Sequence, residues 1–141
     1  MGGPVGDLAG MLAAMAPVLD KCRWTFALVE GDPPADAFAL IHEDEGTTAI
    51  VPEEHGAFGR ITLTVHSALE GVGLTAAVAT ALAARGIACN VVAGFHHDHL
   101  FVPWERRSEA LERLRELAQA AAAGGSPSAA PSGSTTPNPL L

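Results

Sequence analysis

A glycine-bearing turn that leads into a helix is the first place where this sequence could bind a small molecule. Residues 67–73 are Ser-Ala-Leu-Glu-Gly-Val-Gly, and an apolar helical repeat begins at Leu74. The start of a helix presents unpaired backbone N–H groups and a partial positive charge, which suit a carboxylate. Gly71 and Gly73 would let a ligand approach the backbone closely, and Glu70 could receive a ligand ammonium. The alternative is that the two glycines only make a tight turn.

A histidine-rich turn is the second candidate. Three histidines and an aspartate occupy residues 96–99, a composition that can bind zinc or another divalent metal. The spacing argues against a metal, because we expect Asp98 to end a turn and His99 to begin a strand, where neighbouring side chains point to opposite faces. We therefore expect no metal ion. Instead, His97 or His99 would line an interface or pocket and could confer pH dependence there.

Two acidic clusters are the third candidate, at residues 43–45 and at residues 53–54 with His55 beside them. Paired carboxylates can serve as acid and base, but the sequence supplies no phosphate-binding loop or defined partner for them. His66 and Ser67 are neighbours in a predicted strand, so their side chains diverge and do not form a nucleophile–base pair. We expect solvated turns, no catalytic residue, no cofactor and no enzymatic activity.

The segment 60–102 contains the elements that would position these residues. Apolar and polar residues alternate strictly over 61–66, which predicts a half-buried strand. An apolar stripe over 74–82 predicts a helix, and Gly86 stands where a helix C-cap belongs. Further strands are expected over 87–93 and 99–102, with a turn between them, and a second helix over 104–122. The order βαββα is most of a ferredoxin-like α+β unit.

The first part of the chain predicts a smaller set of elements. Asp7 is a plausible N-cap for a short helix that Pro17 would end. The remaining segments predict strands over 24–29, 38–42 and 47–51, with a hairpin turn at 43–46 and a loop over 52–59.

Neither half is a complete βαββαβ unit, because the expected last strand of the second half is missing. Residues 124–141 are rich in Gly, Ser and Pro, which predicts a disordered tail. We therefore expect an N-terminal half over 1–58 and a C-terminal half over 59–123 that complete each other, sharing one sheet or one interface.

Composition restricts the class of protein. The chain has 141 residues, 48% of them hydrophobic, which is enough to form a hydrophobic core. Its formal net charge of −8 argues against nucleic acid and anionic membranes as partners. No apolar run reaches the length of a membrane span, and the N-terminus lacks a basic signal-peptide region. We expect a cytoplasmic protein in which Cys22 and Cys89 form no disulfide, with Cys89 a small core residue in a buried strand.

Two stretches carry a family resemblance. TVHSALEGVGLTAAVATALAARGIACNVVAG and HDHLFVP resemble the ACT domain, and more closely a family of small bacterial proteins made of two ACT-like halves. That family is related to the regulatory ACT domains of aspartate kinase and to arginine-sensor ACT domains, and the resemblance covers about residues 8–120. It implies ferredoxin-like (ACT) βαββαβ units, here two incomplete halves packed together, with antiparallel sheets and helices on one face.

The resemblance also implies a ligand class and its contacts. An amino acid would bind at the interface between ACT units, on Ser67, Leu69, Glu70, Gly71, Val72, Gly73 and Leu74. The candidate pocket or interface residues around it are His66, Asn90, His97, Asp98 and His99.

The expected function is that of a stand-alone ACT-like regulatory protein that binds an amino acid and forms a homodimer. One departure from the family matters, because many ACT domains carry Pro-Gly where this chain has Gly71-Val72-Gly73. That departure favours an alternative, a structural or protein-interaction module without a ligand. A further alternative is a metal-binding protein that uses the turn at 96–99.

Overall fold

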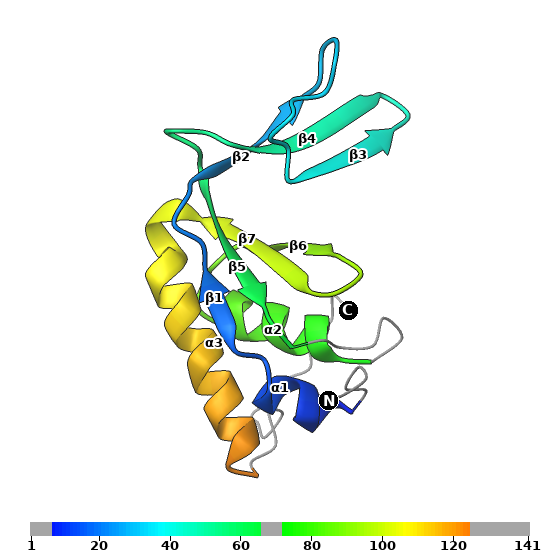
Figure 1. The fold of residues 1–141 in the computed structure, drawn as a ribbon. Coiled ribbons are helices and arrows are strands. Elements are labelled where there is room, and N and C mark those ends of the chain that lie inside the picture. The colour runs from blue at the N-terminus through cyan, green and yellow to red at the C-terminus, as the bar shows by residue number, and fades with distance from the viewer. Residues whose placement is uncertain (1–6, 66–71, 125–141) are drawn as a thin grey trace, which may run out of the picture.

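A computed structural model describes residues 7–65 and 72–124. Over these residues the chain forms one seven-stranded sheet with the order β3-β4-β2-β5-β7-β6, and β1 pairs with β5 off that path (Figure 1). The predicted ferredoxin-like α+β class is confirmed. The elements are α1 (Leu8–Ala13), β1 (Pro17–Leu19), β2 (Trp24–Leu28), β3 (Ala39–Glu43), β4 (Gly46–Pro52), β5 (Phe58–Leu63), α2 (Leu74–Ala83), β6 (Asn90–Ala93), β7 (Asp98–Pro103), a 3-10 turn (Trp104–Arg106) and α3 (Arg107–Ala122).

Strand β1 supplies the strand that the second half lacks. It pairs antiparallel with β5, with Val18 opposite Thr62. The prediction that Pro17 ends the first helix was wrong, because α1 ends at Ala13 and Pro17 begins β1. Asp7 does cap α1, since its carboxylate accepts a hydrogen bond from the Gly10 N–H.

One face of the sheet formed by β1, β5, β7 and β6 packs on the helices. Strand β5 alternates half-buried and buried residues, so the predicted period of two is confirmed. Its apolar side chains and those of β7 form an aliphatic core with α1, α2 and α3. We call this part of the molecule the body. The fully or almost fully buried core side chains include Met11, Leu12, Ile61, Leu63, Val78, Leu82, Leu100, Val102 and Leu114.

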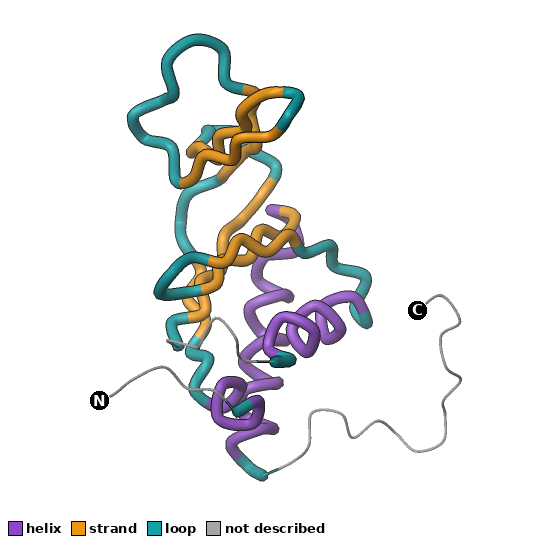
Figure 2. The backbone as a smooth tube through the Cα atoms, turned by 90° about the vertical axis from the view of Figure 1, so that its right-hand side faces the viewer, coloured by secondary structure: helices purple, strands orange, loops and turns teal. Residues whose placement is uncertain are grey.

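Strands β2, β3 and β4, with the segment that joins β2 to β3, form an extension that we call the arm (residues 24–52). The arm continues the sheet through β2, which pairs with β5 only at Trp24 and Phe58. The helices that the structure describes all belong to the body, and the arm consists of strands and loops (Figures 1 and 2). A smaller cluster, built around Trp24, Ile50 and Phe101, joins the arm to the body.

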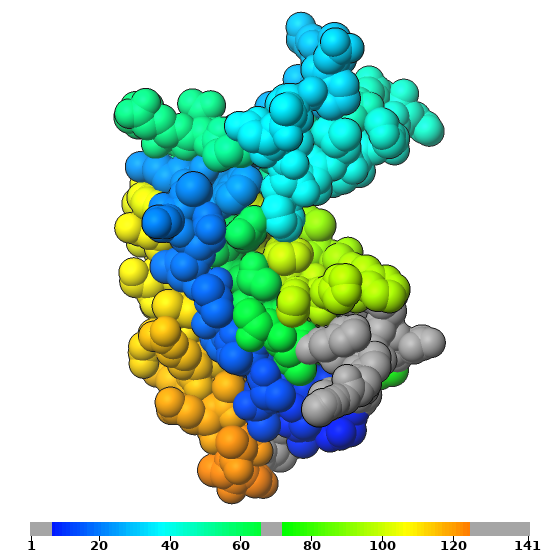
Figure 3. Space-filling model, in the orientation of Figure 1, coloured from blue at the N-terminus to red at the C-terminus, as the bar shows by residue number. Residues whose placement is uncertain are grey.

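The arm overhangs the face of the body sheet that the helices leave open. Figure 3 shows a hollow between the arm and the strands β6 and β7. The residues of this open face follow from the register of the strands. Arg60 lies opposite Phe101, and Thr62 lies opposite His99, so these side chains point away from the helices.

Several predicted boundaries were wrong. The strand expected from residue 87 begins at Asn90, and Cys89 is a half-buried residue just before it rather than part of a buried strand. Ile87 is buried, but its N–H donates to the Leu82 carbonyl and closes the end of α2. Gly86 has the left-handed conformation expected of it, with φ 70°.

Candidate functional site

The structure describes the predicted ligand-binding turn only from Val72 onward. Gly73 is the N-cap of α2 with φ 104°, and as a glycine it has no side chain that could cap the first turn of the helix. A side chain at this position would be strained by the backbone conformation and would place its Cβ 3.2 Å from Leu8 Cδ2. Gly73 is therefore required both by its conformation and by the close packing of α1 beneath it.

The residues on either side of Gly73 differ in what they can offer a ligand. The side chain of Val72 is 82% exposed, whereas Leu74 is 4% exposed and packs in the body core. Leu74 could contact a ligand only through its backbone. Most of the predicted contacts lie outside the described residues, namely His66, Ser67, Leu69, Glu70 and Gly71.

The histidine-rich turn closes a hairpin at the same end of the sheet. The Gly94 N–H donates to the His97 carbonyl at 2.8 Å, and Asp98 begins β7 opposite Leu63, the last residue of β5. The prediction that Asp98 ends the turn was therefore wrong by one residue. Because β5 ends beside Asp98, the turn at 94–97 lies at the end of the sheet from which the chain leaves toward α2.

Asp98 and His99 lie on opposite faces of β7, as the sequence predicted. Asp98 shares its face with Leu63, and burial raises the pKa of its carboxyl while the charge of His97 partly opposes that rise. Within residues 7–65 and 72–124, no three His, Cys, Asp or Glu side chains form a group that could hold a metal ion. The alternation of the strand keeps the adjacent side chains from converging.

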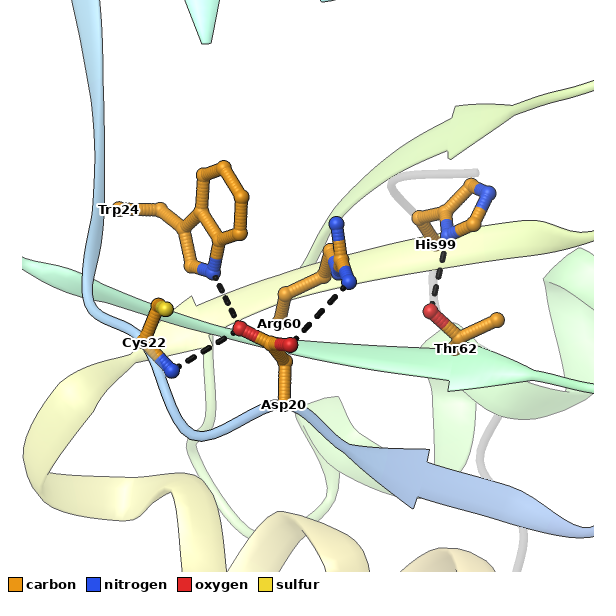
Figure 4. Close-up of polar contacts among 6 residues, drawn as sticks. All are labelled: Asp20, Cys22, Trp24, Arg60, Thr62 and His99. Carbon is orange, nitrogen blue, oxygen red and sulfur yellow. Dashed lines mark hydrogen bonds and ion pairs between the residues drawn. The ribbon is translucent and has the colours of Figure 1, made fainter. Parts of the chain in front are cut away.

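His99 lies on the open face of the body, where the arm meets it. Its Nδ1 shares a hydrogen bond of 2.9 Å with Thr62 Oγ1 (Figure 4). The centroid of its ring lies 4.8 Å from that of Phe38, in an edge-on arrangement. Burial and the positive charges of Arg60 and His97 lower the pKa of His99. Asn90 is exposed on the same face, opposite Phe101.

A polar cluster that sequence analysis missed holds the junction between arm and body. The carboxylate of Asp20 accepts hydrogen bonds from the Cys22 N–H at 2.9 Å, from Trp24 Nε1 at 3.2 Å and from Arg60 Nη2 at 3.3 Å (Figure 4). The Arg60 guanidinium also lies 4.8 Å from the Trp24 ring centroid and 4.5 Å from that of Phe38. Such cation–π contacts favour a desolvated arginine.

No short motif marks these residues in the sequence. Arg60 and Asp20 are 40 positions apart, and each alone has the pattern of an ordinary surface charge.

Two family models match the chain, and both describe an ACT domain. One covers residues 4–65 and the other covers residues 59–116. Together they span residues 4–116. The comparison with curated proteins found no match.

Several solved structures are also similar to this chain. The chain is 40% identical to a Vibrio cholerae protein of unknown function, described as a possible transport protein, with a TM-score of 0.66 over 75% of this chain and 92% of that one. A protein from Agrobacterium tumefaciens is 17% identical, with a TM-score of 0.53 over 67% and 81% of the two chains. The ligand-free regulatory subunit of aspartate kinase from Thermus thermophilus is 12% identical, with a TM-score of 0.57 over 74% and 97%. The last two show a shared fold.

Proposed function

This chain belongs to the ACT-domain family, and we propose that it is a regulatory protein that binds a free amino acid where β5 leads into α2. ACT domains are regulatory rather than catalytic, and they generally bind small ligands. Among the described residues, no helix is long and apolar enough to cross a membrane. The proposal places the protein in the cytoplasm, where free amino acids report metabolic supply.

The uncapped start of α2 is the observation that carries this proposal. Gly73 has no side chain with which to cap the first turn of this ten-residue helix, so the N-cap residue leaves the backbone N–H groups of that turn to other acceptors. A ligand carboxylate would accept hydrogen bonds there and would gain from the helix dipole. Leu8 packs close under Gly73, which holds the backbone of the turn in place.

The proposal assigns the ligand ammonium to Glu70 and the ligand side chain to the remaining predicted contacts in residues 67–72. A ligand held between two ACT units stabilises their association, because it binds the associated state better than the separate units. The read-out would then be a shift in a homodimer equilibrium.

Thermal unfolding in the presence of each of the twenty amino acids tests this function. A true ligand at a hundred times its Kd stabilises the folded protein by about 2.7 kcal/mol, which is a shift of several degrees in a domain of this size. Gly73→Ala should abolish the shift relative to that variant's own Tm, because the added methyl group displaces the turn.

Gly31→Ala is the matched control. Gly31 also has a left-handed conformation, with φ 84°, but nothing lies within 4 Å of the position of an added Cβ. This variant should lose some stability to backbone strain and keep the full ligand-induced shift. An equal shift in the Gly73→Ala protein would refute the proposed site.

A protein-interaction module is the second candidate, and the exposed apolar residues of the arm favour it. Leu28 is 65% exposed, Leu40 40% and Ile41 39%, and β3 is an edge strand of the sheet. Exposed edges of this kind pair readily with other chains. If none of the twenty amino acids shifts the Tm, this function replaces the first.

A further inference from the structure

We propose that the free edge of β3 is a docking site for another protein, one that adds an extended segment with a Lys or Arg at each of its ends. Such a segment would lengthen the sheet by one strand, through main-chain hydrogen bonds to β3. The inference rests on the interaction function given above as the second candidate, and it names the chemistry of the partner. It does not require an amino acid to bind at α2.

Among the edge strands that the structure describes, β3 offers the longest open edge. It pairs with β4 alone, in a register that runs without a break from Ala39 to Glu43, and four of its five residues are exposed. Strand β1 has three residues and begins with Pro17, which has no N–H to donate. Strand β6 has four residues, and its two central ones are half-buried. Neither a proline nor a bulge interrupts β3, so its free edge can accept a further strand.

Exposed apolar side chains flank this edge on both faces of the arm. Leu40 and Ile41 are exposed, and neighbours along a strand point to opposite faces. Leu28 is also exposed and shares the face of Ile41, because both lie opposite Thr48 in their registers with β4. A segment paired with β3 would therefore bury apolar area with its own alternating side chains, in addition to forming main-chain hydrogen bonds.

The free edge borders the hollow under the arm. Phe38, the residue before β3, meets His99 of the body with ring centroids 4.8 Å apart, and β3 is the arm strand that faces β6 and β7 (Figures 1 and 3). The sheet face that carries Ile41 also carries Phe26, whose ring meets that of Phe101 in the body. An added strand would thus lie along the opening of the hollow, with its inward side chains beside Ile41.

Charge restricts the kind of segment that fits. The arm holds six of the sixteen Asp and Glu residues of the chain and none of its eight Lys and Arg residues. Asp36 precedes β3, Glu43 ends it, and Asp44 and Glu45 form the turn that follows. The edge therefore has carboxylates at both ends and apolar residues between them. A segment with a cation at each end and apolar residues between complements this pattern.

The same pattern disfavours a second copy of this chain as the partner. Antiparallel pairing of β3 with itself, centred on Ile41, would place residues 43–45 of each copy beside Asp36 of the other. Parallel pairing would place each acidic end beside its own equivalent. Like charges on neighbouring strands are unfavourable in either case. The acidic ends thus oppose self-association while they leave the edge open to a basic partner.

Fluorescence anisotropy with a labelled heptapeptide, Arg-Val-Thr-Val-Thr-Val-Arg, tests the proposal on the full-length protein. One control peptide has Glu at both ends, and another has Pro in place of the central Val. We expect the first peptide to bind at least about ten times more tightly than either control, because it alone combines two terminal cations with an uninterrupted set of main-chain donors.

Substitutions on the edge test the location. Ile41→Lys places a cation at the centre of the edge and should weaken binding of the Arg-ended peptide about tenfold. Leu28→Lys, on the same face and 65% exposed, is a second variant in case the first does not fold. Val18→Lys is the matched control, because Val18 is an exposed apolar residue on the edge strand β1. It should leave the affinity unchanged.

A pair of double variants tests the role of charge. Asp36→Asn combined with Glu45→Gln neutralises one carboxylate at each end of β3 and should weaken binding about fivefold, because exposed charge pairs contribute modestly. Glu105→Gln combined with Glu112→Gln removes the same net charge from exposed positions outside the arm. This control should change the affinity less than about twofold. Hydrogen exchange should show that the peptide protects amides of β3 and leaves those of β6 unchanged.

Several results would overturn the proposal. These are absence of binding by the Arg-ended peptide, equal binding of the three peptides, and binding that neither Ile41→Lys nor Leu28→Lys weakens. A dimer that forms without peptide and is lost in Ile41→Lys would show that a second copy covers β3 instead.

The outcome at β3 is separable from the outcome at α2. Ile41→Lys should keep any thermal shift that an amino acid produces, and Gly73→Ala should keep binding of the Arg-ended peptide. Loss of peptide binding in a folded Gly73→Ala protein would place the peptide at α2 and would overturn the assignment to β3.

Discussion

The body and the arm share one continuous sheet, but different side chains stabilise them. In the body, aliphatic residues of β5 and β7 are buried against helices, and burial of apolar area is the main source of stability. In the arm, Trp24, Ile50 and Phe38 pack mainly around Phe101 and Arg60. The arm thus depends on a few aromatic and polar contacts at one end, whereas the body has a distributed core.

This difference indicates which part of the molecule opens first by local unfolding. Segments with few buried apolar contacts open at a lower free energy than core elements. The arm should therefore open before the body unfolds. Three changes test that comparison, in order of decreasing effect.

The largest effect is expected from Leu114→Ala in α3. Leu114 is fully buried in the body core, and removing such a side chain costs about 2–5 kcal/mol of unfolding free energy, because the cavity that remains does not close fully. Urea denaturation measures the loss. A change below about 1 kcal/mol would contradict the view that the body core carries the stability.

Phe38→Ala should have a smaller and more local effect. Phe38 meets Trp24, Phe101, His99 and Arg60 at the junction, and it is partly exposed, so its loss should cost roughly 2 kcal/mol. Hydrogen exchange should show faster exchange of the amides in β2, β3 and β4, with those of β5 and β7 unchanged.

Leu28→Ala is the control for the Phe38 variant, because Leu28 belongs to the same arm but is 65% exposed. It should leave exchange in the arm unchanged. Uniform loss of protection across arm and body in Phe38→Ala would show that the two parts open together.

The smallest effect is a pH dependence from His99. The pKa of His99 is lowered in the folded state from its ordinary value of 6.5, so the unfolded state binds more protons in the interval between the two pKa values. The contribution of His99 to the free energy of unfolding is therefore greatest above about pH 6.5, and it decreases as the pH falls toward the pKa of the folded state. Protonation would place a second cation beside Arg60 at the junction.

Comparison of the wild-type protein with His99→Gln isolates this contribution. The difference in unfolding free energy between the two proteins should shrink or change sign as the pH falls from 7.5 through 6.5. Asp98 contributes in the opposite sense, because its raised pKa lowers stability as the pH rises above 3.8. Asp98 is present in both proteins, so its contribution cancels. A pH-independent difference would contradict the effect.

The sequence predicted the elements whose signal is local. The alternation over 61–65 and the apolar stripes of α2 and α3 depend on neighbours within a few residues, and the structure has all three. The conformation of Gly73 and that of Gly86 are local properties as well. Strand β1 was missed because three residues carry no period, and its partner β5 is distant in sequence.

The binding features divide in the same way. The glycine turn before α2 could be proposed from adjacent residues, whereas the junction depends on Asp20, Phe38 and Arg60 meeting in space. Single-sequence reasoning cannot assemble residues whose proximity is created by the fold.

The position of β1 also determines the order in which the molecule can be assembled. The strand precedes the arm in the chain, and its partner β5 follows only after the whole arm has been synthesised. During translation β1 therefore stays unpaired while the arm is synthesised. The chain between β1 and β5 is long, and closing a loop of that length slows folding. The consequence is that the sheet of the body cannot be completed until both β1 and β5 have been made, because β1 lies before the arm and pairs with a strand that lies after it.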